Sequence, residues 1–382
     1  MLKTNKKTQR IIALDLIRGY FLLVILINHL NRFPGFFDVF TGRGQLWTSA
    51  AEGFFLISGL LVGMIRGREV IAGHLDVATI KMLKRGLELY AWTVILTIFF
   101  TVIGDHYLGN VGLKAGIEPL SSGGVWTVIG RALDLHYVYG WADFLQFYAV
   151  YMLLAPIFMF LLYKRLWPLA LITILGLFGL KSHSQYFIWQ LYFFGGTIIG
   201  YYWSELTAYL SRRSKRQQTN LKRGVYVAAL AVLATDIVGT FLFRILDRHN
   251  LLGTTHSSIG YRLLSNLHSL NDSWFNRFNA NVSYGIGRVA VSLVWFSALY
   301  LFVRQHEEWF KKYLGKLLLP VGCNPLLVYG FGAVIIFSVE LIFPHNTKFI
   351  PNTLINLVAI SLSWAVANFK IPSKKKQNLL NV

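Results

Sequence analysis

The stretch IIALDLIRGYFLLVILINHL occupies residues 11–30 and decides the class of fold. Twenty predominantly apolar residues are enough for one helix to cross the hydrocarbon core of a bilayer. Similar stretches recur along all 382 residues, so that hydrophobic residues make up 55% of the chain and charged residues only 14%. Because soluble proteins carry about one quarter charged residues, this composition indicates an all-α integral membrane protein.

We predict ten transmembrane helices, with both termini in the cytoplasm. Their predicted bounds are 11–30, 48–66, 87–104, 142–163, 166–181, 186–204, 224–244, 285–304, 317–341 and 350–369. In this orientation most of the 37 basic residues fall in cytoplasmic segments, as the positive-inside rule requires. We therefore expect a multi-pass protein of the bacterial cytoplasmic membrane, with a basic N-terminus (1–10), a membrane domain (11–370) and a basic tail (371–382).

The net charge of +20 raises the alternative of a nucleic-acid-binding protein. The basic residues lie in short loops between apolar stretches, however, which favours membrane orientation over nucleic-acid contact. The single cysteine, Cys323, excludes an intramolecular disulfide and a cysteine metal cluster, and the histidines show no metal-ligand spacing. We expect the lipid bilayer as a partner, and neither a nucleic acid nor a metal.

Three ionisable side chains lie within the first predicted helix, where a charge is costly and so marks a functional candidate. Arg18 and His29 are eleven residues apart, which places them on nearly the same face and separates them by about 16 Å along the axis. Asp15, one turn from Arg18, is placed to pair with it. An imidazole is a general base and a guanidinium binds phosphate, so this face fits a phosphate-bearing donor that reaches a base. The alternative is an interfacial histidine beside a local ion pair.

The second predicted helix supplies a carboxylate. Residues 51–61, AEGFFLISGLL, place Glu52 near the outer end of that helix, at a depth similar to that of His29. A carboxylate beside an imidazole orients the ring and stabilises its protonated form. Ser58 is a less favoured nucleophile, because Ser58-Gly59 with Gly63 is typical of helix packing through small residues.

Several polar residues lie near the outer ends of later helices. Asp143, Gln146 and Gln190 are placed to line a binding site for an acceptor substrate on the outer side of the membrane. Trp141 belongs to the predicted outer loop 105–141, and its ring fits either a membrane interface or contact with a sugar. Both interpretations stay open.

Two further pairs of residues predict structure. Asp236 and Arg288 are expected to pair between the seventh and eighth helices, since intramembrane charges usually find each other. Asn324 followed by Pro325 predicts a helix break at membrane depth, and such breaks usually line a cavity.

Together these stretches resemble the membrane-bound acyltransferase superfamily (acyltransferase 3-like), whose Arg-x10-His pattern is matched by Arg18 and His29. Further stretches resemble one branch, the OpgC-type succinyltransferases of periplasmic glucans. These stretches are Asp143 through Pro156, Ile188-Trp-Gln190 with Gly195 and Gly196, and Gly322 through Leu326. The resemblance covers approximately residues 10–370.

The resemblance implies an O-acyltransferase that takes an acyl group, such as succinyl or acetyl, from cytoplasmic acyl-CoA. The acceptor would be a hydroxyl of an extracytoplasmic glycan or polyol, with acyl-CoA as a cosubstrate and no tightly bound cofactor. His29 would be the base and Arg18 would engage the donor. Relatives carry Arg-x2-Arg at the third helix, where this chain has Lys81, Lys84 and Arg85, so the phosphate contact there would rely partly on the point charge of lysine.

Within this interpretation Glu52 or Asp143 orients His29, while Asp15 holds Arg18. A transporter or flippase of a polar or glycan substrate is the first alternative, since it also needs intramembrane charges. A non-catalytic scaffold is the second. Binding of CoA distinguishes the enzyme from the transporter.

Overall fold

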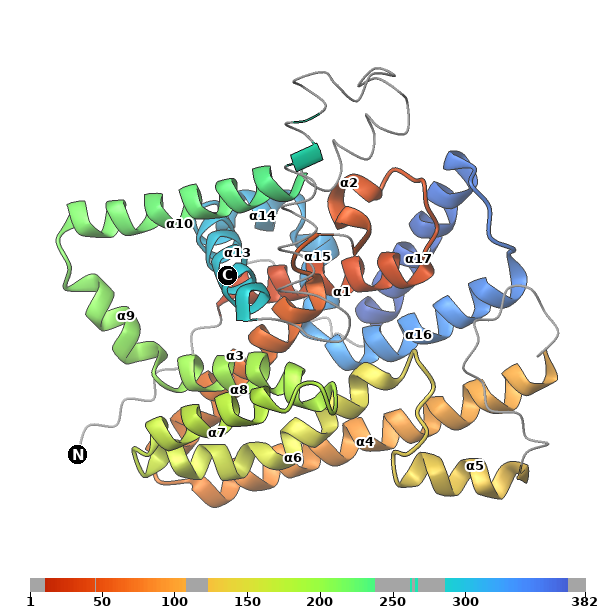
Figure 1. Ribbon diagram of the computed structural model, residues 1–382, viewed down its shortest axis with the longest axis horizontal. Coiled ribbons are helices and arrows are strands. Elements are labelled where there is room, and N and C mark those ends of the chain that lie inside the picture. Colours follow the sequence, from red (N-terminus) through yellow and green to blue (C-terminus); the bar gives the residue numbers. More distant parts are fainter. Residues whose placement is uncertain are drawn as a thin grey trace.

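The computed structural model describes residues 11–44, 46–107, 123–237, 262, 265–266 and 286–369, and the elements of this part are helical (Figure 1). The first half contains α1 (Ile12–Leu30), α2 (Asp38–Thr41), the 3-10 helix η1 (Gly42–Gly44), α3 (Ala50–Ile71), α4 (Leu75–His106), α5 (Gly124–Leu133), α6 (Asp143–Tyr163) and α7 (Trp167–Gly179). The second half contains α8 (Tyr186–Tyr201), α9 (Trp203–Ser211), α10 (Lys215–Asp236), α13 (Ile286–Gln305), α14 (Glu307–Tyr313), α15 (Gly315–Cys323), α16 (Pro325–Ile342) and α17 (Phe349–Phe369). The all-α prediction is confirmed for this part of the chain.

Among the described residues, six helices are long and apolar enough to cross a membrane: α1, α4, α6, α13, α16 and α17. The fifth and sixth predicted spans correspond to the shorter helices α7 and α8. The seventh, 224–244, lies partly outside the described residues, and the predicted terminal segments 1–10 and 371–382 lie wholly outside them. The ten-span count and the cytoplasmic termini therefore stay predictions.

One predicted span lies inside a longer helix. The third span, predicted over 87–104, is part of the 32-residue helix α4, which begins at Leu75. The charged residues before position 87 argued against a membrane segment, but they do not stop a helix, because a helix satisfies its own backbone and continues beyond the bilayer.

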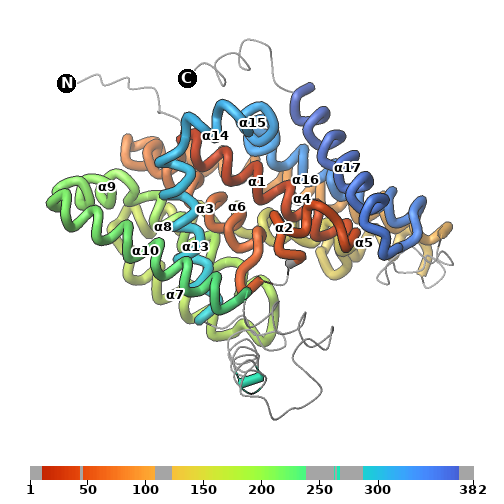
Figure 2. Tube along the Cα trace, turned by 90° about the horizontal axis from the view of Figure 1, so that it is seen from above, coloured from red at the N-terminus to blue at the C-terminus, as the bar shows by residue number. Residues whose placement is uncertain are grey.

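Helix α1 lies at the centre of the molecule in both views (Figures 1 and 2). Of its 19 residues, 15 are buried, including Asp15, and it contacts α3, α13, α15, α16 and α17. A helix that is apolar on all sides is expected to be enclosed by other helices. Its few polar groups consequently face protein rather than lipid.

Helices α3 and α8 approach each other through glycines. A Cβ atom added to Gly59 would overlap the carbonyl oxygen of Phe193, and one added to Gly63 would overlap that of Thr197. In return, Gly196 of α8 lies against the Leu56 carbonyl. The predicted small-residue packing around Ser58-Gly59 is confirmed, and it fixes the position of α3.

The predicted helix break at Asn324 is also confirmed. Helix α15 ends at Cys323 and α16 begins at Pro325, with Asn324 between them donating side-chain hydrogen bonds to the carbonyls of Pro320 (3.1 Å) and Ala367 (3.2 Å). The backbone just before the break lies against α1, since a Cβ at Gly322 would overlap the Asp15 carbonyl oxygen. The break is therefore held at the level of Arg18.

Candidate functional site

Five basic side chains from three helices line one cavity of about 480 Å³. We call it the basic cavity, and its basic residues are Arg18 of α1, Arg66 of α3, and Lys81, Lys84 and Arg85 of α4. All four residues predicted to bind a donor through positive charge thus lie together. Sequence reasoning missed Arg66, which is the last residue of the predicted second span.

Most of these cations have a carboxylate partner. Glu69 pairs with Arg66 at 3.0 Å and with Lys81 at 2.6 Å, and Glu88 pairs with Arg85 at 2.7 Å. In the described part of the chain, Lys84 forms no ion pair and is exposed. The cavity therefore retains positive charge for an anionic ligand.

Arg18 is fixed at the inner wall of the basic cavity. Its guanidinium pairs with Asp15 at 2.8 Å, as predicted, and its Nε donates to the carbonyl of Gly322 at 2.5 Å. That carbonyl lies one residue before the end of α15, so Arg18 ties α1 to the helix break. Pro325, the first residue of α16, lines the same cavity.

His29 lies at the other end of the same face of α1, beside a small cavity of about 20 Å³, here called the His29 cavity. The rings of His29 and Trp141 pack together with centroids 5.1 Å apart. Trp141, predicted for the acceptor side, thus lies at the histidine. The other walls come from α1 and α16: Leu22, Ile25, Leu26, Val328, Tyr329, Gly332, Ala333 and Ile336.

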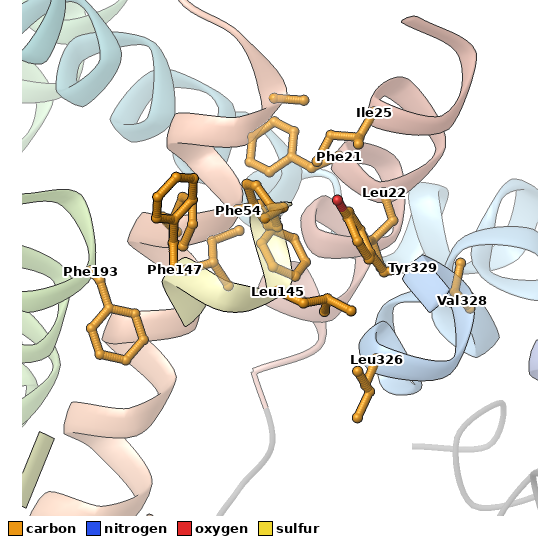
Figure 3. Packing of buried hydrophobic residues seen from close by; sticks show 14 of the residues in the cluster. Phe21, Leu22, Ile25, Phe54, Leu145, Phe147, Phe193, Leu326, Val328 and Tyr329 are labelled. Atoms are coloured by element: carbon orange, nitrogen blue, oxygen red, sulfur yellow. The ribbon is translucent and has the colours of Figure 1, made fainter. Parts of the chain in front are cut away.

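About one helical turn separates the two cavities. Arg18 and Pro325 line the basic cavity. Leu22 lies one turn after Arg18, Tyr329 lies one turn after Pro325, and these two residues line the His29 cavity. Figure 3 shows Leu22 and Tyr329 side by side at this boundary. The Tyr329 ring stacks on Phe144 of α6, with centroids 5.4 Å apart. A thin apolar layer therefore divides the basic cavity from the His29 cavity.

Asp143 lies at this layer. It is the first residue of α6, two residues after Trp141, and its neighbour Phe144 stacks on the ring of Tyr329. Of the two carboxylates predicted to orient His29, Asp143 is therefore the one adjacent to a wall of the His29 cavity.

Glu52 contacts the start of its own helix and a side chain of α13. It is fully buried, its carboxylate accepts from the backbone N–H of Ser49 at 2.9 Å and caps α3, and it pairs with Arg288 of α13 through an Nε contact of 2.5 Å. Asp236, the predicted partner of Arg288, accepts from the Trp47 N–H at 2.9 Å, and the pairing of Asp236 with Arg288 stays a prediction. Depth along the helix predicted the level of Glu52, but not which face of α3 it occupies.

We expect Glu52→Gln to lower thermal stability substantially, by about 3–5 kcal/mol, because it removes the buried Glu52 carboxylate from the ion pair with Arg288. The double variant Glu52→Gln/Arg288→Gln should recover part of the loss. Thermal unfolding of the purified protein measures both. Glu88→Gln is the matched control, since Glu88 is half exposed and pairs at the surface. An unchanged melting temperature for Glu52→Gln would contradict the structural role.

The predicted acceptor residues Gln146 and Gln190 lie elsewhere. Gln190 is buried and donates to the carbonyls of Ile174 (2.8 Å) and Phe187 (3.2 Å), while Gln146 accepts from the Tyr186 hydroxyl at 3.1 Å. Neither lines the His29 cavity. Their contacts join α6, α7 and α8.

Sequence reasoning missed two residues near His29, although one of them, Glu340, is a carboxylate inside the predicted span 317–341 and so a candidate by the cost of its charge. Tyr329 resembles any tyrosine in an apolar stretch. Glu340 is buried on α16, one turn beyond Ile336, and its charge acts on Arg32. Burial, followed by the charge of Glu340, raises the pKa of the Tyr139 hydroxyl, which therefore stays protonated. The Glu340 carboxylate therefore lies near Tyr139, which is two residues before Trp141.

Comparison with known proteins gives one result. A family model described as OpgC protein matches residues 10–375, which is nearly the whole chain. No curated protein and no solved structure matches the chain. The match includes every residue of the basic cavity and of the His29 cavity. With its helical membrane fold and these two cavities inside the matched region, the chain belongs to the OpgC protein family.

Proposed function

We propose that this chain is an integral membrane O-acyltransferase that moves an acyl group from cytoplasmic acyl-CoA to a hydroxyl of an extracytoplasmic glycan. OpgC family membership and the apolar helices support a membrane acyltransferase. One observation carries the rest of the proposal: the basic cavity and the His29 cavity lie along the same face of α1 with lining residues one helical turn apart, while Arg18 and His29 themselves are separated by about 16 Å along the axis. A bacterial cytoplasmic membrane location is part of the proposal.

In this proposal the basic cavity holds the CoA phosphates. Arg18 is already oriented by Asp15 and Gly322, so its remaining donors are presented to a ligand at little entropic cost. Lys84 and its neighbours on α4 supply further positive charge at the open side of the cavity. The pantetheine arm then passes the boundary at Leu22 and Tyr329, which side-chain rotation opens.

The chemistry at His29 is a direct transfer. The imidazole accepts the proton of the acceptor hydroxyl as that oxygen attacks the thioester carbonyl carbon. The carbon–sulfur bond breaks, and the imidazolium returns the proton to the leaving CoA thiolate. Trp141 holds the ring against one side, and Asp143 stabilises the transient positive charge across the layer.

The proposal is tested with the purified full chain in lipid nanodiscs. Radiolabelled succinyl-CoA or acetyl-CoA is supplied with a glucose oligosaccharide, and label in the oligosaccharide is measured. CoA alone should also raise the melting temperature, since a ligand stabilises the state that binds it. Absence of both transfer and CoA stabilisation would refute the enzyme and leave the transporter.

We expect Lys84→Gln to raise the KM for acyl-CoA about 3- to 10-fold with little change in kcat, because one exposed charge contributes about 1 kcal/mol to phosphate binding. The difference should shrink as salt is added, because ions screen exposed charges. Steady-state kinetics at two salt concentrations measure it.

Lys164→Gln is the matched control for Lys84→Gln. Lys164 follows α6, lies over the rings of Phe160 and Tyr163, and does not line the basic cavity. Equal KM changes in the two variants would mean that general surface charge, rather than the basic cavity, attracts acyl-CoA.

A further inference from the structure

A larger cleft lies on the face of α1 opposite Arg18 and His29. Tyr20 lines this cleft. Tyr20 is nine positions before His29, and this separation places the two side chains on opposite faces of the helix. Two adjoining cavities, of about 590 and 1040 Å³, form this cleft. They share five lining residues: Tyr20, Val24, Phe40, Thr41 and Leu299. Acyl transfer at His29 does not use this cleft.

The larger cavity is the apolar half of the cleft. Most of its walls are aliphatic and aromatic side chains of α1, α2, α13, α14, α15 and α17, and its polar lining residues include Thr41, His306 and Ser361. Phe302 and Leu357 on two of these helices are each almost half exposed, so the half is open at the molecular surface. Because α13 and α17 are long enough to cross a membrane, that surface faces hydrocarbon. An apolar space of this size is filled by lipid chain and not by water.

The smaller cavity is the polar half. Its charged lining residues are Asp38 and Arg43, which pair with each other at 2.9 Å. The hydroxyls of Thr48 and Ser292 bind each other at 2.8 Å across the wall. Further lining residues are Thr41, Ser49, Tyr20 and the indole of Trp295. Many of its other lining residues are apolar, among them Phe21 and Leu233. The described lining is therefore neutral, and it combines hydroxyls with aliphatic and aromatic surface.

The chemistry of the polar half indicates which kind of lipid headgroup fits it. A phosphate would require a cation that is not already matched, and the Arg43 charge is matched by Asp38. The hydroxyls of Ser49 and Ser292 donate to Glu52 and to the Arg288 carbonyl, so they present their acceptor lone pairs to a ligand. A sugar has several hydroxyl donors, which suit these acceptors. Its apolar C–H face suits the flat ring of Trp295.

We propose that this cleft binds a neutral glycolipid, with its sugar headgroup in the polar half and a hydrocarbon chain along α1 in the apolar half. The site is separate from the acyl-transfer site, so either proposal stands or fails without the other. It gives the protein a second ligand that belongs to the bilayer itself.

The test uses the full chain in nanodiscs that contain equal amounts of glucosyl diacylglycerol and phosphatidylglycerol. Native mass spectrometry after mild detergent extraction counts the lipids that stay bound. We expect about a tenfold preference for glucosyl diacylglycerol. A preference for phosphatidylglycerol, or none, would overturn the assignment of the headgroup.

Matched variants on α17 test the chain-binding half. Leu357 lines the apolar half and Leu354 does not, yet they are 48% and 54% exposed on the same helix. Leu357→Trp should lower glycolipid retention about tenfold, while Leu354→Trp should leave it unchanged. Equal retention in both variants would show only bulk lipid and overturn the site.

A polar-half variant keeps the proposal testable if Leu357→Trp does not fold. Thr48→Val removes one hydroxyl while keeping the shape of the side chain, and it should reduce the preference for glucosyl diacylglycerol about 2- to 10-fold, as expected for one hydrogen bond. Ser361→Ala, in the apolar half, is its control. An unchanged preference in Thr48→Val would contradict the sugar contact.

Discussion

Replacing His29 with alanine is expected to lower the rate of acyl transfer about 10²- to 10⁴-fold, which is the usual contribution of a general base. Binding of CoA should be retained, because Arg18 and the α4 cations line a different cavity from His29. Transfer from radiolabelled succinyl-CoA measures the first effect, and thermal stabilisation by CoA measures the second. This separation of catalysis from binding distinguishes a base from a residue that merely supports the fold.

His136→Ala is the matched control. His136 lies in the segment that leads to Trp141, its side chain is 76% exposed, and it pairs only at the surface with Asp134 at 3.0 Å. It should retain full transfer activity. His29→Gln, which keeps some of the bulk packed against Trp141, should be as inactive as His29→Ala. A folded His29→Ala protein with full activity would refute the mechanism.

The face shared by Arg18 and His29 was predictable because α1 is a regular helix, and helical periodicity fixes relative direction along one element. The Asp15–Arg18 pair follows from the same rule. The helix break at Asn324 was predictable because proline cannot continue the hydrogen-bond ladder. These features depend on local geometry alone.

Contacts between distant segments were not predictable in the same way. The partner of Glu52 is Arg288, 236 residues later in the chain, and no periodicity relates α3 to α13. Gln190 was expected near an acceptor because of its depth, but it serves backbone carbonyls between helices. Position along the membrane normal can be read from one helix, whereas rotation about its axis depends on how all neighbouring helices pack.

The basic cavity shows both what the sequence predicted and what it did not. Lys81, Lys84 and Arg85 were chosen through a family motif, and the structure places them beside Arg18 because α4 continues as a helix beyond its apolar part. Arg66 was missed because a basic residue at a helix end is also what membrane orientation requires. The packing of α1, α3 and α4 is needed to distinguish a residue that only orients the protein in the membrane from one that lines the basic cavity.

Gly196→Ala is expected to destabilise the protein by about 1–3 kcal/mol, the cost of overpacking, whereas Gly195→Ala should be neutral or stabilising by up to about 1 kcal/mol. The two glycines are neighbours on α8. A Cβ at Gly196 would overlap the Leu56 carbonyl oxygen and lie 3.0 Å from the Leu60 nitrogen, while a Cβ at Gly195 meets nothing within 4 Å. Main-chain atoms cannot rotate away, so α3 and α8 must separate.

That separation should also reach the basic cavity, since α3 carries Ser58 and Arg66 into its wall. Gly196→Ala should therefore show both a lower melting temperature and a higher KM for acyl-CoA, while Gly195→Ala changes neither adversely. Thermal unfolding and steady-state kinetics on the two purified variants measure this. Equal melting temperatures would mean that α3 and α8 are not in close backbone contact, and α3 would then not be fixed beside the donor site.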